Sequence, residues 1–352
     1  MRGNLTKEGA FMANQKVDRC SVVITSPLEA ELVSRPLEYG ELKPTELLVK
    51  TDYSVISAGT ELSIFRGSEP WAALPYAPGY GAVGRVLETG SEVTEFVPGD
   101  RVFTYGSHAS VNLISDGLVL KVPDALDGVL APLLARMGQV AFTSVRVASA
   151  QLGDVVTVQG LGLVGNLAAQ LFKLAGCTVI GIDVSPKRLA IAKACGIDFA
   201  VDVNATDPVS AVKEITGGAM SAVVVEATGI SNLVATAACM AAKGGEVVLL
   251  GTPRGTYDGN ATDLLMKVHL ASSAVVLKGA HEWIFPLKPT PGVKHSIERN
   301  VQQLMEWGTI GKLHGRELVS HVVSPEMVPE VYQELNKRNE DYFGVVIDWT
   351  GH

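Results

Sequence analysis

The most constraining feature of this sequence is a glycine-rich turn between a predicted strand and a predicted helix. The segment VVTVQGLGLVGNLAAQ places Gly160, Gly162 and Gly165 in G-x-G-x-x-G spacing, directly after a β-type run. The first glycine allows a tight turn, the second lets the backbone approach a pyrophosphate, and the third permits close helix packing. The helix N-terminus that follows attracts anions. The segment therefore predicts a dinucleotide site, which also includes Leu163 and Val164.

An acidic residue follows at the spacing expected for such a site. Asp183 ends the next predicted strand, about 20 residues after Gly160, where a carboxylate meets the adenosine ribose. A carboxylate there repels a 2′-phosphate, so the sequence favours NAD over NADP. Arg188 leaves alternatives open, because it could lie along the adenine, reach a phosphate or be a solvated helix residue. Thr228, which follows a later strand, is a further predicted cofactor residue.

The pattern along the chain predicts an α/β protein with two domains. From about residue 155 to 279, β-type runs alternate with helical stretches, which implies a doubly wound parallel sheet with right-handed crossovers. Residues 21–145 consist of short β-rich runs broken by Gly and Pro. Beyond about residue 285, an amphipathic helix near 295–308 and a last helix and strand are expected to return to the first domain. We predict an N-terminal extension (1–20), a β domain (21–146 and 286–352) and a nucleotide-binding domain (147–285).

Composition excludes several classes of partner. The net charge is −8, which argues against a nucleic-acid surface, since phosphate binding needs clustered Lys and Arg. No apolar run reaches the roughly 18 residues of a membrane helix, and the first residues lack the apolar core of a signal peptide. The four cysteines are scattered, as is usual in a reducing compartment. We expect a cytoplasmic protein with a small-molecule substrate, no nucleic acid and no membrane partner.

A second segment carries a resemblance to a known family. The stretch PYAPGYGAVGRVLETGSEVTEFVPGDRV, together with the glycine-rich turn, resembles the medium-chain dehydrogenase/reductase superfamily, which includes the zinc alcohol and polyol dehydrogenases. The resemblance covers nearly the whole chain and implies a GroES-like β domain, a Rossmann domain and hydride transfer with a nicotinamide cofactor. It also places Gln139 on the nicotinamide side of the site. The strand near 272–279 implies a homodimer joined at the sheet edge.

The departures from that family concern the metal. Where zinc members read C-G-T-D, this chain reads Ala58-Gly59-Thr60-Glu61, and where they read G-H-E it reads Gly79-Tyr80-Gly81. The third ligand position falls near Ala135. Zinc needs Cys, His or a carboxylate, which alanine cannot replace. The sequence therefore predicts no zinc and no other metal.

Without a metal, hydrogen-bond donors and a base must handle the charge on the alcohol oxygen. Thr60 is the first candidate, because the resemblance implies that its hydroxyl bonds the reacting oxygen. Tyr80 stands in the place of the histidine ligand, so its phenol is expected either to donate to that oxygen or to fill the vacated space.

Two further residues are candidates for the base. Glu61 could act as a base if burial raises its pKa, or it could be a structural carboxylate paired with Arg66 or Arg136. His108 lies in a loop after a β-type run and titrates near working pH, although a lone loop histidine is more often a surface residue. The sequence does not choose among Tyr80, Glu61 and His108.

The segment SAGTE is similar to a branch that contains bacteriochlorophyllide dehydrogenases and sugar or cyclitol oxidoreductases. We therefore predict a zinc-independent, NAD-dependent enzyme that interconverts a secondary alcohol of polyol, sugar or cyclitol type and a ketone. One alternative is an NADPH-dependent quinone or enone reductase with the same fold. A second alternative is an inactive relative that still binds the nucleotide.

Overall fold

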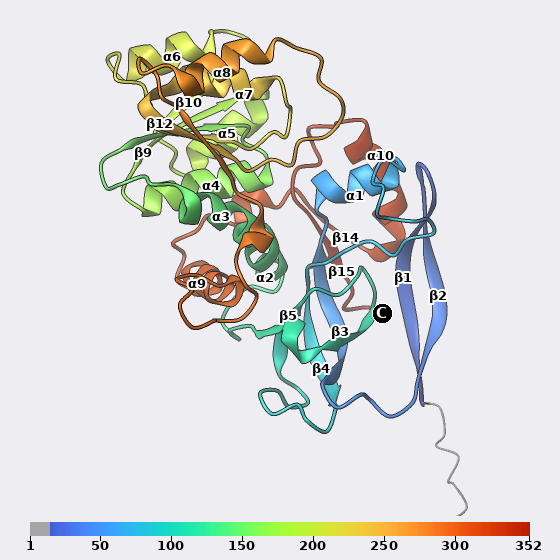
Figure 1. Cartoon of the computed structure of the whole chain (residues 1–352). Helices are drawn as coiled ribbons and strands as arrows, with labels where there is room; N and C mark the ends of the chain where they lie inside the picture. The colour runs from blue at the N-terminus through green and yellow to red at the C-terminus, as the bar shows by residue number, and fades with distance from the viewer. Residues whose placement is uncertain (1–14) are drawn as a thin grey trace, which may run out of the picture.

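A computed structural model describes residues 15–352 and contains two large sheets (Figure 1). The parallel sheet has six strands in the order β10-β9-β8-β11-β12-β13. Its strands are β8 (Val155–Gln159), β9 (Thr178–Asp183), β10 (Phe199–Asp202), β11 (Ser221–Glu226), β12 (Ala241–Leu249) and β13 (Val276–Gly279). The helices between them are α4 (Leu163–Leu174), α5 (Pro186–Ala194), α6 (Pro208–Ile215), α7 (Leu233–Met240) and α8 (Ala261–His269). The predicted doubly wound parallel sheet is confirmed.

The strand order reverses beside β8, and this point locates the ligand site. From β8 the chain adds β9 and β10 on one side, and then crosses to add β11, β12 and β13 on the other. Ligands of such sheets bind where the carboxyl ends of the strands meet this reversal. Gly160 follows β8 directly, so the glycine-rich turn lies at this point.

The second sheet has seven strands and is largely antiparallel. Six strands follow the order β14-β15-β3-β4-β5-β7, and β6 pairs with β3. They are β3 (Glu46–Val55), β4 (Ala82–Thr89), β5 (Arg101–Thr104), β6 (Val111–Ser115), β7 (Val119–Lys121), β14 (His321–Val323) and β15 (Val345–Asp348). The last strand, β15, pairs with β3, so the end of the chain returns to the β sheet as predicted.

A hairpin lies beside this sheet and forms a third, two-stranded sheet (Figure 1). Its strands are β1 (Gln15–Ser26) and β2 (Glu29–Tyr39). Val22 and Ile24 of β1 are fully buried, in contact with the hydrophobic cluster that contains Trp349. A strand thus runs through residues 15–20 of the predicted extension, whose first 14 residues lie outside the described part of the chain.

Two helical segments position the candidate site. The SAGTE segment begins a helix, α1 (Ala58–Phe65), which packs beside α10 (Val328–Asn336). A longer helical run consists of α2 (Leu130–Leu133), the π-helical turn η2 (Leu134–Gly138) and α3 (Gln139–Val147). This run packs against α4 and against α9 (Ile297–Thr309), which matches the amphipathic helix expected near 295–308. Such π turns occur often at functional sites, and this one contains Ala135 and Arg136.

Candidate functional site

The glycine-rich turn has the geometry that a dinucleotide needs. Gly160 adopts φ +92°, a conformation that favours glycine, as the chain leaves β8. A Cβ atom on Gly165 would lie 1.8 Å from the carbonyl oxygen of Gly160, so only glycine lets α4 pack this closely. A Cβ on Gly162 would meet nothing within 4 Å, which leaves open space at the N-terminus of α4. Leu163 and Val164 form the first turn of that helix and are half-buried.

Asp183 is fixed beside this turn. Its carboxylate accepts hydrogen bonds from the backbone N–H of Leu161 at 2.7 Å and from that of Ser185 at 2.9 Å. Arg188 lies nearby, with Nη1 3.8 Å from the Asp183 carboxylate and its guanidinium 6.0 Å from the Phe343 ring. The carboxylate is therefore held at the end of β9, and the role of Arg188 toward a nucleotide stays a prediction.

Thr228 also lies against the turn. A Cβ on Gly160 would come within 2.6 Å of Thr228 Cγ2. The backbone N–H and hydroxyl of Thr228 both donate to Glu226, and the Gly229 N–H donates to the same carboxylate. Glu226 is 1% exposed, and the sequence analysis did not identify it. A carboxylate at the end of an apolar strand is a signal for a residue that accepts hydrogen bonds from the turn that follows.

Gln139 begins α3 and is fully buried, yet neither atom of its amide has a hydrogen-bond partner among the described residues. A buried amide left without partners is costly, so a ligand or a water is expected to satisfy it. The carboxamide of a nicotinamide carries the complementary donor and acceptor. The residues of this chain therefore fit a dinucleotide at both of its ends.

Thr60 lies on α1, and Arg254 from the nucleotide-binding part of the chain contacts its side chain. Its hydroxyl oxygen accepts a hydrogen bond from Arg254 Nη2 at 3.1 Å. Arg254 Nε also donates to Glu69 at 2.8 Å. Because Arg254 belongs to the loop between β12 and α8, these bonds join the nucleotide-binding sheet to α1. No spacing in the sequence links residues 60 and 254, and Arg254 was missed.

Tyr80 lies close to the Thr60 side chain. Burial raises the pKa of its phenol, and the charge of Glu61 raises it further, whereas the charge of Arg136 and polar contacts with the Ser57 and Thr60 side chains act in the opposite direction. The ring is stacked on the Arg136 guanidinium, whose central carbon is 4.4 Å from the ring centroid. The phenol is thus protonated at neutral pH and close to the Thr60 hydroxyl.

Glu61 and His108, predicted separately, form one buried pair. Both are fully buried, and His108 Nε2 lies 3.0 Å from the Glu61 carboxylate. The predicted pairing of Glu61 with Arg66 or Arg136 is wrong, because Arg66 bonds Asn336 and Arg136 bonds Glu282. The expectation that a loop histidine lies on the surface is also wrong.

The pair belongs to a larger buried network. Glu61 also accepts from the Ser57 N–H at 2.9 Å and from the Tyr332 hydroxyl at 2.7 Å. Burial works to raise the pKa of Glu61, but the charge of His108 and the hydrogen bonds together hold it below its ordinary value. Beyond His108, the Ser54 hydroxyl contacts its Nδ1 at 2.8 Å. Glu61 is therefore an ionised acceptor whose partners come from the protein itself.

The positions compared above with the zinc ligands of the family do not form a metal-binding group in this structure. Ala58, Tyr80 and Ala135 stand at the positions that correspond to the ligands of zinc members of the family, and Ala135 is fully buried. Within residues 15–352, no group of three or more His, Cys, Asp or Glu side chains is placed to hold a metal ion. The same residues include no helix long and apolar enough to cross a membrane.

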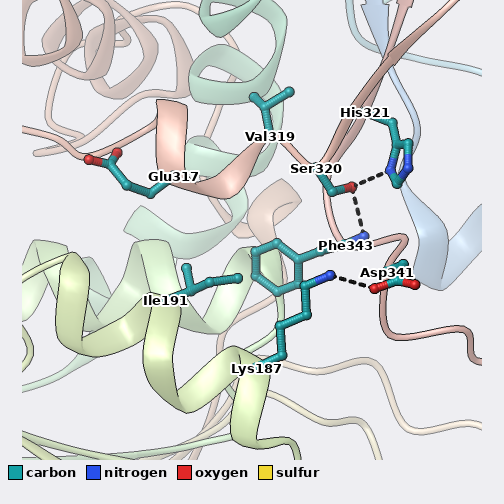
Figure 2. Close-up of a pocket in the computed structure, with 8 residues that line it drawn as sticks. All are labelled: Lys187, Ile191, Glu317, Val319, Ser320, His321, Asp341 and Phe343. Carbon is teal, nitrogen blue, oxygen red and sulfur yellow. Dashed lines mark hydrogen bonds and ion pairs between the residues drawn. The ribbon is translucent and has the colours of Figure 1, made fainter.

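A separate pocket of about 480 Å³ lies between α5 and the C-terminal segment (Figure 2). Its polar side chains are satisfied within the protein, since Lys187 pairs with Asp341 at 2.8 Å and Ser320 bonds both His321 and Phe343 N–H. None of the predicted site residues lines it. The pocket is lined by Lys187, Ile191, Glu317, Val319, Ser320, His321, Asp341 and Phe343.

Comparison with known proteins agrees with this geometry. Residues 164–284 match the family described as zinc-binding dehydrogenase, and residues 43–124 match the alcohol dehydrogenase GroES-like domain, which together cover more than half of the chain. D-guloside 3-dehydrogenase of Escherichia coli (strain K12) is 27% identical over 340 residues, covering 89% of this chain and 95% of the relative. An alcohol dehydrogenase of Geobacillus stearothermophilus is 26% identical over 327 residues, with coverage of 82% and 94%.

Solved structures share the fold. One is a protein from Sinorhizobium meliloti 1021 described as a zinc-binding dehydrogenase, bound to NADP, with a TM-score of 0.77 and 22% identity over 94% of this chain and 99% of that one. The glycine-rich turn, the buried amide of Gln139 and the two-sheet architecture agree with both family matches. This chain belongs to the medium-chain dehydrogenase/reductase superfamily and is an oxidoreductase that acts on CH–OH groups.

Proposed function

We propose that this chain is a zinc-independent, NAD-dependent dehydrogenase that interconverts a secondary alcohol and a ketone, with Tyr80 and Thr60 at the reacting oxygen. The observation that carries the proposal is the position of Tyr80. Its phenol stands where the family has a metal ligand, next to the Thr60 hydroxyl and over a buried guanidinium. A donor at this place can stabilise charge on an alcohol oxygen without a metal.

The proposed step moves one hydride and one proton. A bound nicotinamide cofactor would supply the acceptor for the hydride, which leaves the carbinol carbon with both electrons of the C–H bond. The O–H bond breaks in the same oxidation, and its proton passes to the phenolate form of Tyr80, either directly or through the Thr60 hydroxyl, which gives its own hydrogen to the phenolate as it takes the proton of the alcohol. In the opposite direction, the Tyr80 phenol donates a proton to the ketone oxygen. Thr60 accepts from Arg254, so its own hydrogen is free to contact the substrate.

Glu61 and His108 support the site and do not act as the base in this proposal. The lowered pKa of Glu61 makes it a weaker base, and neither side chain has exposed surface. Glu61 accepts hydrogen bonds from Ser57 and Tyr332, which fix the start of α1 against α10, and His108 bonds Glu61 from a third segment. They thereby hold Thr60, the neighbour of Glu61 in the chain, in place.

NAD is proposed because of Asp183. Its carboxylate ends β9 and is held by two backbone N–H groups, so a 2′-phosphate at this point would meet a fixed negative charge.

The proposed substrate class is a polyol, sugar or cyclitol. Polar side chains around Thr60 and the similarity to D-guloside 3-dehydrogenase support this class. We also propose a cytoplasmic location, which four free cysteines support.

A panel assay tests the function. Purified protein is given polyols, sugars and cyclitols with NAD or NADP, and quinones and enones with NADPH or NADH. We expect reduction of NAD with at least one secondary alcohol of the panel. Turnover only of enones or quinones with NADPH would support the reductase alternative, and nucleotide binding without any turnover would support an inactive relative.

A further inference from the structure

Arg136 is the most deeply buried arginine beside the candidate site, and it is held in one orientation. Its two terminal nitrogens donate to the two oxygens of Glu282, at 2.5 and 2.6 Å. Both side chains are 7% exposed. Burial works to lower the pKa of Arg136, but the Glu282 carboxylate outweighs it and raises the pKa above its ordinary value. The pair is therefore a fixed cation and anion inside the protein.

The Gly79-Tyr80-Gly81 segment is shaped around this arginine. A Cβ on Gly81 would lie 2.8 Å from Arg136 Cγ and 2.9 Å from Arg136 Cβ, so the arginine stem fills the space that a larger residue at 81 would need. Gly79 has φ +97°, and a Cβ there would lie 2.5 Å from His108 N. The two glycines thus let the segment pass between Arg136 and His108. This path sets the Tyr80 ring on the guanidinium face.

Three charged or titratable groups face Tyr80, each from a different element. They are Glu61 on α1, Tyr332 on α10 and Arg136 of the π turn η2, and the Arg136 guanidinium lies over the Tyr80 ring. Glu282 of the short helix η3 (Glu282–Ile284) reaches Tyr80 only through Arg136. Arg136 is therefore the one positive charge among these groups that is packed on the Tyr80 ring.

The cation also has unused hydrogen-bonding capacity. Arg136 Nε is buried without a partner among the described residues, and so is the hydroxyl of Tyr105, whose ring centroid lies 6.0 Å from the guanidinium carbon. A purely structural ion pair is expected to satisfy all of its buried donors. The open donor points instead to a pair that also serves the site.

We propose that the Arg136–Glu282 pair is a positioning device for Tyr80, in which the guanidinium fixes the face of the ring and supplies the positive charge that makes the phenol a better proton donor. The inference rests on the proposed function, since it assigns Tyr80 a proton. A nearby cation stabilises a phenolate and a nearby anion destabilises it. Removing the cation should therefore weaken the acid, whereas removing only the Glu282 charge should strengthen it.

The test uses variants of the full chain. The double variant Arg136→Met/Glu282→Leu removes the cation without leaving an unpaired buried charge, a replacement that proteins often tolerate. Arg146→Met is the matched control, because Arg146 lies in the same helical run and is also stacked on an aromatic ring, 4.0 Å from the Phe142 centroid. Tyrosinate absorbance is titrated against pH, and the Tyr80 component is identified by its loss in a Tyr80→Phe background.

In the double variant, we expect the Tyr80 midpoint to move upward by about one pH unit or more and kcat to fall about tenfold or more, while KM stays within about twofold. In Arg146→Met, neither the midpoint nor kcat should change. A folded double variant with an unchanged Tyr80 midpoint would overturn the inference. Unchanged turnover of Tyr80→Phe itself would instead overturn the proposed function.

If the double variant does not fold, a second variant tests the inference. Glu282→Gln keeps the shape of the side chain and removes its negative charge, so the cation beside Tyr80 is no longer neutralised. We expect the Tyr80 midpoint to move downward, opposite to the first shift. No shift, or an upward one, would contradict the inference.

Discussion

At the scale of single residues, Tyr80 is the centre of the proposed chemistry because of what surrounds it. The Ser57 and Thr60 side chains lie close enough to its phenol to influence the pKa, and its ring covers Arg136. A phenol is a proton donor at neutral pH, so it can stabilise charge on oxygen in the transition state. An apolar residue at the same position would leave that charge with the Thr60 hydroxyl but without the phenol as a donor.

The change Tyr80→Phe should therefore lower kcat about 100-fold and leave the fold intact. KM should change little, because the lost hydrogen bond matters most in the transition state. Steady-state kinetics with the best alcohol of the panel measures both constants. Tyr342→Phe serves as the control, since Tyr342 stacks on His321, a residue of the separate pocket. Equal kcat in wild type and Tyr80→Phe would rule out this role.

Glu61 gives a pH-dependent prediction. Because the folded state holds its pKa below the ordinary value of 4.5, ionised Glu61 stabilises the fold above that pH, and the stabilisation disappears as the pH falls through the lowered value. Glu61→Gln should lower the free energy of unfolding by about 3 kcal/mol at neutral pH. The difference between variant and wild type should shrink below about pH 4.

Denaturant titrations at several pH values measure this difference. The control is Glu298→Gln on α9, a partly buried carboxylate that pairs with Lys288. A Glu61→Gln deficit that stays constant from neutral to acidic pH would show that its charge does not stabilise the fold.

At the scale of elements, the contact between α1 and the loop after β12 links the two sheets at the site. Arg254 makes both bonds of this contact, to Glu69 and to Thr60. It is a partly exposed ion pair, and such pairs add about 1 kcal/mol or less to stability. The main contribution of Arg254 is therefore expected to be that it orients the Thr60 hydroxyl.

Arg254→Ala should change the free energy of unfolding by less than about 1 kcal/mol but lower kcat/KM about tenfold. The control Lys121→Ala breaks another partly exposed ion pair, with Asp100, and should change neither quantity. Parallel measurements of unfolding and of kinetics separate the two effects. A loss of stability with unchanged kcat/KM would mean that Arg254 only holds the sheets together.

The elements also show how far sequence reasoning reaches. The β8 turn, the alternating strands and the helices α4, α5 and α9 were predictable, because glycine spacing and apolar periodicity are local. The helix at 58–65 was missed, since its residues lack a strong apolar stripe and Ser57 makes no side-chain cap. The π turn at Leu134–Gly138 leaves no signal of this kind.

The residues of the candidate site also fall into a group that the sequence predicts and a group that it does not. Gly160, Gly165 and Asp183 follow from local spacing, and Thr60 and Tyr80 follow from the resemblance. The pairs Glu61 with His108, Arg136 with Glu282, and Thr60 with Arg254 join residues far apart in the chain. Only tertiary packing brings such residues together, so a single sequence cannot reveal them.

At the scale of the whole molecule, β13 is an edge strand with apolar side chains on its surface. Val276 is 45% exposed and Leu277 is 37% exposed, although β13 belongs to the parallel sheet. Natural proteins seldom leave such an edge open to water. A homodimer in which two copies pair along β13 therefore stays our proposal for the assembly.

Sedimentation equilibrium tests the assembly. We expect wild type to be a dimer at micromolar concentration and Val276→Lys/Leu277→Lys to be a folded monomer, because two charges would be buried at the joint. Leu152→Lys is the control, since Leu152 is strongly exposed and lies against Gly176, which precedes β9. A monomeric wild type, or a dimer that both changes leave intact, would contradict this arrangement.

The central claim is that the chemistry around Tyr80 and Thr60 needs no metal, although the family match carries a zinc-binding description. The most direct measurement is turnover with NAD of chelator-treated protein whose metal content has been determined, before and after zinc is added back. We predict the same kcat for the metal-free protein and for the zinc-supplemented one. Loss of turnover on chelation, restored by one equivalent of zinc, would contradict the claim and would require ligands other than Ala58, Tyr80 and Ala135.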